Sequence, residues 1–175
     1  MALDVDQVSV RGVWWRHIPH RGKVRYRPLP PPDNRWQHGR VVEGFYLASD
    51  APTVWAEWYR FLAELAVPPD RQMPRNLWRW MVSVTVADLS TEDRLSRVGL
   101  RPLPPSRSSW AAYQKVGDQL YREGWSGLVA PSAARPGGGK VLCLFRTAEV
   151  VPGAAPLPPP RVYRRPPPPP TGMRT

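Results

Sequence analysis

Cysteine and lysine are both scarce in this chain of 175 residues, and each scarcity narrows what the protein can be. The single cysteine, Cys143, excludes an internal disulfide bond and a zinc site built from cysteines. Lysine is so rare that arginine supplies nearly all of the 25 basic residues behind the net charge of +11. Such a charge fits nucleic-acid binding, a polyphosphate pocket that uses two or three arginines, or a merely solvated surface.

Long apolar runs are also missing. No stretch reaches about 18 consecutive apolar residues, so we expect no membrane-spanning segment and no membrane partner. The opening sequence, MALDVDQVSV, carries acids where a signal peptide would carry basic residues before an apolar run. We therefore expect a cytoplasmic protein.

Proline, by contrast, is abundant, with 24 residues in the chain, and ten of them lie between Pro152 and Pro170. Residues 151–175 combine proline and arginine without a usable apolar pattern, which favours solvated polyproline II. We predict one compact domain over residues 8–150, followed by a disordered tail over 151–175. The tail resembles ligands of aromatic-grooved adaptor modules, or it simply reflects a biased composition.

Strand and helix patterns alternate irregularly before the tail. We predict strands at residues 8–18, 40–49, 77–86 and 140–146, with a short one beginning near 127, and helices at 51–66, 91–99 and 108–123. The predicted helix caps are Asp50 for the first helix, Ser90 with Asp93 for the second, and Ser108 or Ser109 for the third. This order predicts an α+β fold, a compact single domain with a mixed sheet.

Glu57 is the residue that this pattern makes conspicuous. It lies one turn inside the first predicted helix, close to Trp55 and Trp58. A carboxylate among aromatic rings is costly to desolvate unless something pairs with it or uses it. Pairing with Arg60 or Arg16 is one interpretation, and a functional role is the other.

Several segments in a fixed order resemble the RES domain family, which is named for its arginine, glutamate and serine. The matching segments are RWQHG with Arg35 and Trp36, FYLASDAPTVWAE from Tyr46 to Glu57, GWSGLVAPSA with Ser132, and the apolar KVLCLF. The early WWRH, with Arg16, resembles the opening strand of the family. The resemblance spans about residues 12 to 147, and Gln37 stands where the family often has asparagine.

The resemblance implies an ADP-ribosyltransferase-like fold and the activity of a bacterial toxin that degrades NAD. The bond to nicotinamide would be cleaved by phosphorolysis or by hydrolysis, with NAD as substrate and no further cofactor. A separate antitoxin, often with a helix-turn-helix, would block the active site. No helix-turn-helix is visible in this chain, so that partner would be another protein. The choice between water and phosphate, and the presence of a homodimer, stay open.

The residue types fit this chemistry independently of the resemblance. Cleavage of the nicotinamide–ribose bond builds positive charge on the ribose, as glycoside hydrolysis does. Glu57 would stabilise that charge, and Arg35 would hold a diphosphate or a phosphate through its planar fork. Tyr46 offers a ring and a hydroxyl for the nicotinamide. Ser132 offers a hydroxyl for a phosphate or for the nicotinamide amide.

Arg16 and Trp36 complete the set of residues expected to contact the substrate. We expect no metal site, because His17 and His20 would point to opposite faces of a strand and no third ligand is evident. Two alternatives remain open on the same scaffold. One is a non-catalytic basic protein that binds nucleic acid or a protein partner, and the other is an ADP-ribosyltransferase that modifies proteins.

Overall fold

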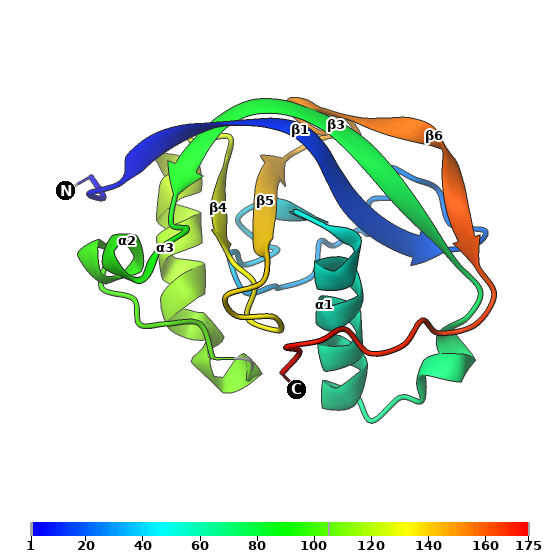
Figure 1. Ribbon diagram of the computed structural model, residues 1–175. Coiled ribbons are helices and arrows are strands. Elements are labelled where there is room, and N and C mark those ends of the chain that lie inside the picture. Colours follow the sequence, from blue (N-terminus) through cyan, green and yellow to red (C-terminus); the bar gives the residue numbers. More distant parts are fainter. Residues whose placement is uncertain (1, 105, 175) are drawn as a thin grey trace.

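Two long strands, β1 (Asp6–Pro19) and β3 (Arg75–Asp88), pair antiparallel over their whole length. The computed structural model describes residues 2–104 and 106–174. In Figure 1 the two strands arch together across the top of the molecule. Their pairing brings the start of the chain against its middle and provides the frame on which the other elements rest.

Three shorter strands complete a closed barrel. They are β2 (Glu43–Ala48), β4 (Gly127–Pro131) and β5 (Lys140–Arg146). β2 pairs with β5 and β5 with β4, both antiparallel, whereas β4 joins β3 in parallel. A bridge between Trp15 and Ala48 then connects β1 to β2 and closes the ring. The predicted α+β fold with a mixed sheet is confirmed.

Helix α1 (Ala51–Glu64) begins as the sequence predicts. The carboxylate of Asp50 accepts a hydrogen bond from the backbone N–H of Thr53 at 2.8 Å. Pro52 lies in the first turn, where its missing N–H costs nothing. Figure 1 shows α1 standing beside the barrel, below the arch of β1 and β3.

Helix α2 (Glu92–Arg97) has a different cap from the predicted one. The hydroxyl of Thr91, not that of Ser90, accepts the backbone N–H of Arg94 at 3.3 Å. The predicted capping box of Ser90 and Asp93 is therefore wrong, because the helix starts one residue later than that box requires.

Helix α3 (Trp110–Arg122) follows a 3-10 turn, η2 (Arg107–Ser109). Ser109 occupies the predicted cap position, but its side chain makes no cap hydrogen bond, because its backbone is already helical. A second 3-10 turn, η1 (Pro69–Gln72), links α1 to β3. Within the described ranges, no helix has the length and apolar character needed to cross a membrane.

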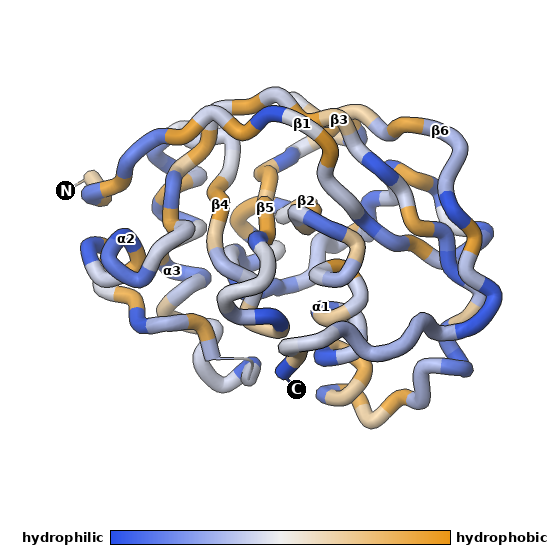
Figure 2. Tube along the Cα trace, viewed as in Figure 1, coloured by the Kyte–Doolittle hydropathy of each residue, from blue (hydrophilic) through white to orange (hydrophobic). Residues whose placement is uncertain are grey.

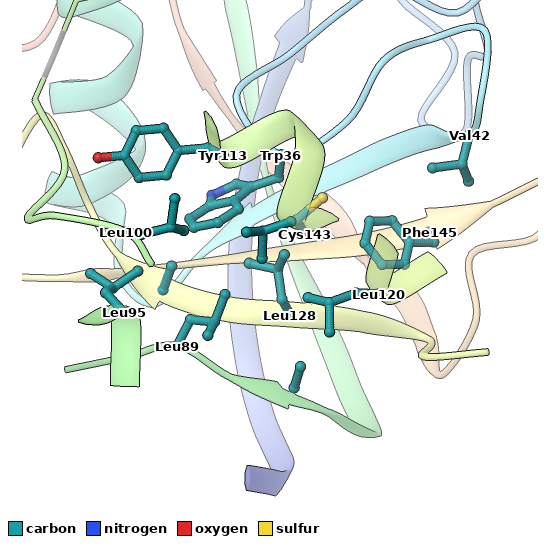
Figure 3. Close-up of a cluster of buried hydrophobic side chains, with 13 residues drawn as sticks. Trp36, Val42, Leu89, Leu95, Leu100, Tyr113, Leu120, Leu128, Cys143 and Phe145 are labelled. Atoms are coloured by element: carbon teal, nitrogen blue, oxygen red, sulfur yellow. The ribbon is translucent and has the colours of Figure 1, made fainter. Parts of the chain in front are cut away.

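The core consists of three groups of buried apolar side chains. One lies between α3 and the sheet and includes Trp36, Leu128 and Cys143 (Figure 3). A second fills the barrel around Trp80, and a third lies under α1.

Burial in the first group raises the pKa of the Cys143 thiol to about 12. The hydropathy colouring in Figure 2 shows apolar segments along the barrel strands.

The predicted disordered tail is wrong for residues 154–163. They form strand β6 (Ala154–Tyr163), which pairs antiparallel with β3. The sequence pattern misleads because a proline-rich segment can still occupy a sheet edge, where one side needs no N–H donors. A register shift between Leu77 and Arg79 accommodates the irregular strand. The domain thus extends beyond its predicted end at residue 150.

The last residues continue from β6 across α1 toward the loop after β4 (Figure 1). The Tyr59 hydroxyl donates to the carbonyl of Pro167, and the backbone N–H of Arg174 donates to the carbonyl of Ala134 at 2.7 Å. Arg135 also donates to the carbonyl of Thr171. These contacts tie the C-terminal segment to the domain.

Candidate functional site

A cavity of about 900 Å³ lies between α1, β1, β2 and the loop over residues 19–36. Its wall includes Glu57 of α1, Tyr46 of β2 and Arg16 of β1, together with Arg35 and Trp36 from the loop. Five of the six predicted site residues therefore line one hollow, although they come from separate parts of the chain. The sixth, Ser132, lies immediately behind the wall.

The carboxylate of Glu57 is held by three hydrogen bonds. Ser132 Oγ donates to Oε1 at 2.7 Å, and the backbone N–H of Ala134 donates to the same oxygen at 3.3 Å. Arg60 Nε donates to Oε2 at 3.2 Å, which settles the open pairing in favour of Arg60 over Arg16. The Glu57 side chain keeps 26% of its surface exposed. It is therefore fixed in place and still accessible from the cavity.

Ser132 supports Glu57 rather than facing the cavity. Its residue is 1% exposed, and its hydroxyl both donates to Glu57 and accepts the backbone N–H of Arg135 at 3.0 Å. Its neighbours Pro131 and Ala133 are the residues that line the cavity. Both hydrogen-bonding functions of the hydroxyl are thus occupied by protein, so the predicted contact with phosphate or nicotinamide is not what this geometry offers.

Tyr46 presents its ring to the cavity while its hydroxyl is engaged inside the protein. The hydroxyl accepts the backbone N–H of Trp36 at 3.2 Å and donates to Gln37 Oε1 at 2.6 Å. Burial raises the pKa of Tyr46 well above its ordinary value, so the phenol stays protonated. Gly44 permits this arrangement, because a Cβ there would lie 2.5 Å from Gln37 Oε1.

Arg35 brings a buried positive charge to the wall, with 8% of its surface exposed. Its guanidinium lies over two rings, 5.5 Å from the centroid of Tyr113 and 5.9 Å from that of Trp110. Burial and the nearby Arg60 lower the pKa of Arg35, whereas Glu57 raises it. Trp36 itself packs edge-on against Tyr113 at 5.4 Å and is mostly core.

Helix α3 fixes the loop that carries Arg35. Gln114 Nε2 donates to the carbonyl of Asn34 at 2.9 Å. The buried carboxylate of Asp118 accepts the backbone N–H of His38 at 2.9 Å and contacts His38 Nδ1 at 2.6 Å. The position of the arginine therefore depends on polar residues far along the sequence.

Arg75 of β3 also lines the cavity, and sequence reasoning missed it. Arg75 Nε donates to His17 Nδ1 at 2.8 Å, and the His17 ring stacks on Trp55 with centroids 5.3 Å apart. Burial, with Arg75 and Arg16 nearby, lowers the pKa of His17 well below its ordinary value. His17 is therefore neutral, with its proton on Nε2. Burial lowers the pKa of Arg75 to about 10.

The paired histidines of the sequence serve separate purposes. His20 contacts Asn76 Oδ1 through Nδ1 at 2.8 Å, whereas His17 contacts Arg75. Within residues 2–104 and 106–174, no group of three or more His, Cys, Asp or Glu side chains is arranged to hold a metal ion.

The sequence also did not single out Phe61 and Trp110, which line the cavity with Arg60. For Phe61 a signal existed: it follows Glu57 by four residues, as Arg60 follows it by three, so all three share one helix face. Trp110 carried no such signal, because only tertiary packing brings the start of α3 toward α1.

Comparisons with known proteins identify the family and the fold of this chain. The family model described as the RES domain matches residues 11–165. No curated protein matches the chain. Among solved structures, a chain of the crystal structure of the M. tuberculosis MbcT–MbcA toxin–antitoxin complex is similar, with a TM-score of 0.69 and 20% sequence identity. The match covers 86% of each chain, and at this identity it concerns the fold.

Proposed function

Because this chain belongs to the RES domain family, we propose that it is a toxin-type enzyme that cleaves the nicotinamide–ribose bond of NAD. The observation that carries the proposal is the Glu57 carboxylate, which is fixed by Ser132 at 2.7 Å on the wall of a cavity of about 900 Å³. That volume lies within the range of small-molecule sites and suits a dinucleotide.

In the proposed reaction the bond between C1′ of the ribose and N1 of nicotinamide breaks. Nicotinamide leaves with the electron pair, and positive charge develops on the ribose. The Glu57 carboxylate, oriented by Ser132 and the N–H of Ala134, stabilises that charge without having to reorganise. An oxygen of phosphate or water then bonds to C1′; a water nucleophile releases its proton to solvent or buffer.

Each of the other wall residues suits a different part of NAD. The guanidinium groups of Arg35 and Arg60 lie close to Glu57 and suit the diphosphate. The ring of Tyr46 suits the nicotinamide, since its hydroxyl is already bonded. Arg16 donates from Nη1 to the carbonyl of Tyr46 at 2.8 Å, so it steadies β2 and adds charge for a phosphate.

A separate antitoxin is the proposed partner. The structural neighbour was solved as a toxin–antitoxin complex, and the likeness to it extends over 86% of this chain. A partner that covers the cavity mouth would prevent NAD from entering. We expect cells that make this chain alone to lose NAD and stop growing.

The test is product analysis with purified protein and NAD, with and without inorganic phosphate. Free ADP-ribose indicates hydrolysis, and ADP-ribose bearing a new phosphate at C1′ indicates phosphorolysis. ADP-ribose found on a macromolecule would instead favour a protein-modifying transferase. Intact NAD under all conditions, with a protein shown to be folded by circular dichroism, would overturn the proposal.

A further inference from the structure

Phe61, Arg107 and Trp110 form a stacked group of planar side chains at the cavity. Phe61 and Trp110 both line it. The Arg107 guanidinium lies over both rings, 5.7 Å from the Phe61 centroid and 5.0 Å from that of Trp110. Arg107 Nε also donates to Glu64 at 3.0 Å, so the guanidinium is tied to α1. The reaction proposed above uses none of these three side chains.

The group is open to ligands. Phe61 keeps 42% of its surface exposed, although it is a large apolar ring, and the Arg107 side chain keeps 50%. An apolar ring left exposed on a cavity wall is a typical feature of a site that receives a flat partner. Aromatic faces and guanidinium planes are the surfaces on which nucleobases stack.

The spacing along α1 places this group on the far side of Arg60 from the acid. At about 1.5 Å per residue, Phe61 lies about 6 Å beyond Glu57 along the helix axis, and Glu64 about 10 Å beyond it. Arg60 lies between them on the same face, and the Arg35 guanidinium is 5.9 Å from the Trp110 ring.

The order along the wall is therefore carboxylate, cations, planar rings. The order along NAD is nicotinamide ribose, diphosphate, adenosine. If the ribose lies at Glu57 and the diphosphate at the cations, the adenine reaches the rings.

We propose that Phe61, Arg107 and Trp110 form a purine clamp that binds the adenine of NAD. This inference rests on the proposed function for the identity of the substrate. The clamp makes the enzyme selective for the dinucleotide, because nicotinamide mononucleotide carries the reacting bond but no adenine. Adenosine monophosphate carries the adenine and one phosphate, so it should bind without being a substrate.

The first experiment measures binding of adenosine monophosphate by calorimetry. We expect the wild type to bind it and Phe61→Ala to weaken the binding about tenfold. Arg107→Ala is a second variant that should weaken it, and it removes a half-exposed side chain. Leu65→Ala is the matched control, because Leu65 is 46% exposed at the C-cap of α1 and does not line the cavity.

The clamp is wrong if the wild type does not bind adenosine monophosphate, or if Phe61→Ala and Leu65→Ala bind it equally well. The second experiment compares cleavage of NAD and of nicotinamide mononucleotide. We expect Phe61→Ala to raise KM for NAD about tenfold and to leave kcat/KM for the mononucleotide unchanged. Equal losses on both substrates would overturn the clamp. Binding of adenosine monophosphate without NAD consumption would refute the proposed reaction and leave the clamp standing.

Discussion

Helices α1 and α3 both pack an apolar face against the barrel, yet their polar side chains do different work. On α3, Gln114 and Asp118 are buried and bond to backbone groups of the loop at residues 34–38. On α1, Glu57 and Arg60 pair with each other at the cavity wall. The α3 side chains are buried and hold a loop in place, whereas the α1 charges stand on the cavity wall, where we propose that they act on a ligand.

The largest effect on stability should come from α3. Asp118→Ala removes the acceptor of the His38 N–H, and we expect the free energy of unfolding to fall by about 3 kcal/mol. Urea denaturation measures this, with Lys115→Ala on the exposed side of α3 as the control. A loss below about 0.5 kcal/mol would show that α3 does not hold the loop in the way the hydrogen bonds indicate.

The helix starts offer a matched comparison. Asp50 caps α1 with its side chain and also accepts Arg135 Nη1 at 3.0 Å, whereas Ser109 makes no side-chain cap hydrogen bond to α3. We expect Asp50→Ala to lower the free energy of unfolding by about 1.5 kcal/mol and Ser109→Ala by less than about 0.5 kcal/mol. Equal losses of unfolding free energy in the two variants would show that the side-chain cap of α1 contributes no more than Ser109 does at the start of α3.

Ser132 tests whether the support of Glu57 matters for chemistry. Ser132→Ala removes the hydrogen bond of 2.7 Å, and we expect kcat for NAD to fall about tenfold with KM nearly unchanged. If Ser132 contacted the substrate directly, its loss would raise KM instead. Ser108→Ala, on the exposed η2 turn, is the control.

His17 gives the smallest expected effect, one that depends on pH. Its pKa is lowered in the folded protein, so the unfolded chain takes up a proton at about pH 6.5 that the folded chain does not. The contribution of His17 is complete above pH 6.5 and declines as the pH falls toward its folded pKa. We expect a loss of about 1 kcal/mol per pH unit in that window, and a shallower slope for His17→Gln. Identical slopes from pH 7 to 5 would contradict it.

Local patterns in the sequence predicted much of the fold. Asp50 followed by Pro52 predicted the start of α1, and the β-branched run before Asp88 predicted β3. The same local logic failed for β6, because edge pairing with β3 depends on tertiary contacts that composition does not reveal. The cap of α2 failed by a single residue, since serine and threonine are both good caps and stand side by side at Ser90 and Thr91.

The candidate site could be predicted only from the fixed order in which the family-like segments follow one another in the sequence. Ser132 and Glu57 are separated by 75 residues, and no helical or strand period connects them. The registers of β2 with β5 and of β5 with β4 bring the two together. Resemblance to the family placed both residues in one site in advance, but it did not predict the hydrogen bond between them. Arg75 and Trp110 had no motif, and only the folded chain places them on the wall.

The decisive measurement is NAD consumption by Glu57→Gln beside its unfolding curve. Glutamine keeps the size of the side chain and an acceptor for Ser132, and removes the charge. We expect kcat to fall at least about 10³-fold while the free energy of unfolding changes by less than about 1 kcal/mol. Glu92→Gln, on the exposed first turn of α2, should retain full activity. NAD cleavage by Glu57→Gln within tenfold of the wild-type rate would contradict the role of this carboxylate.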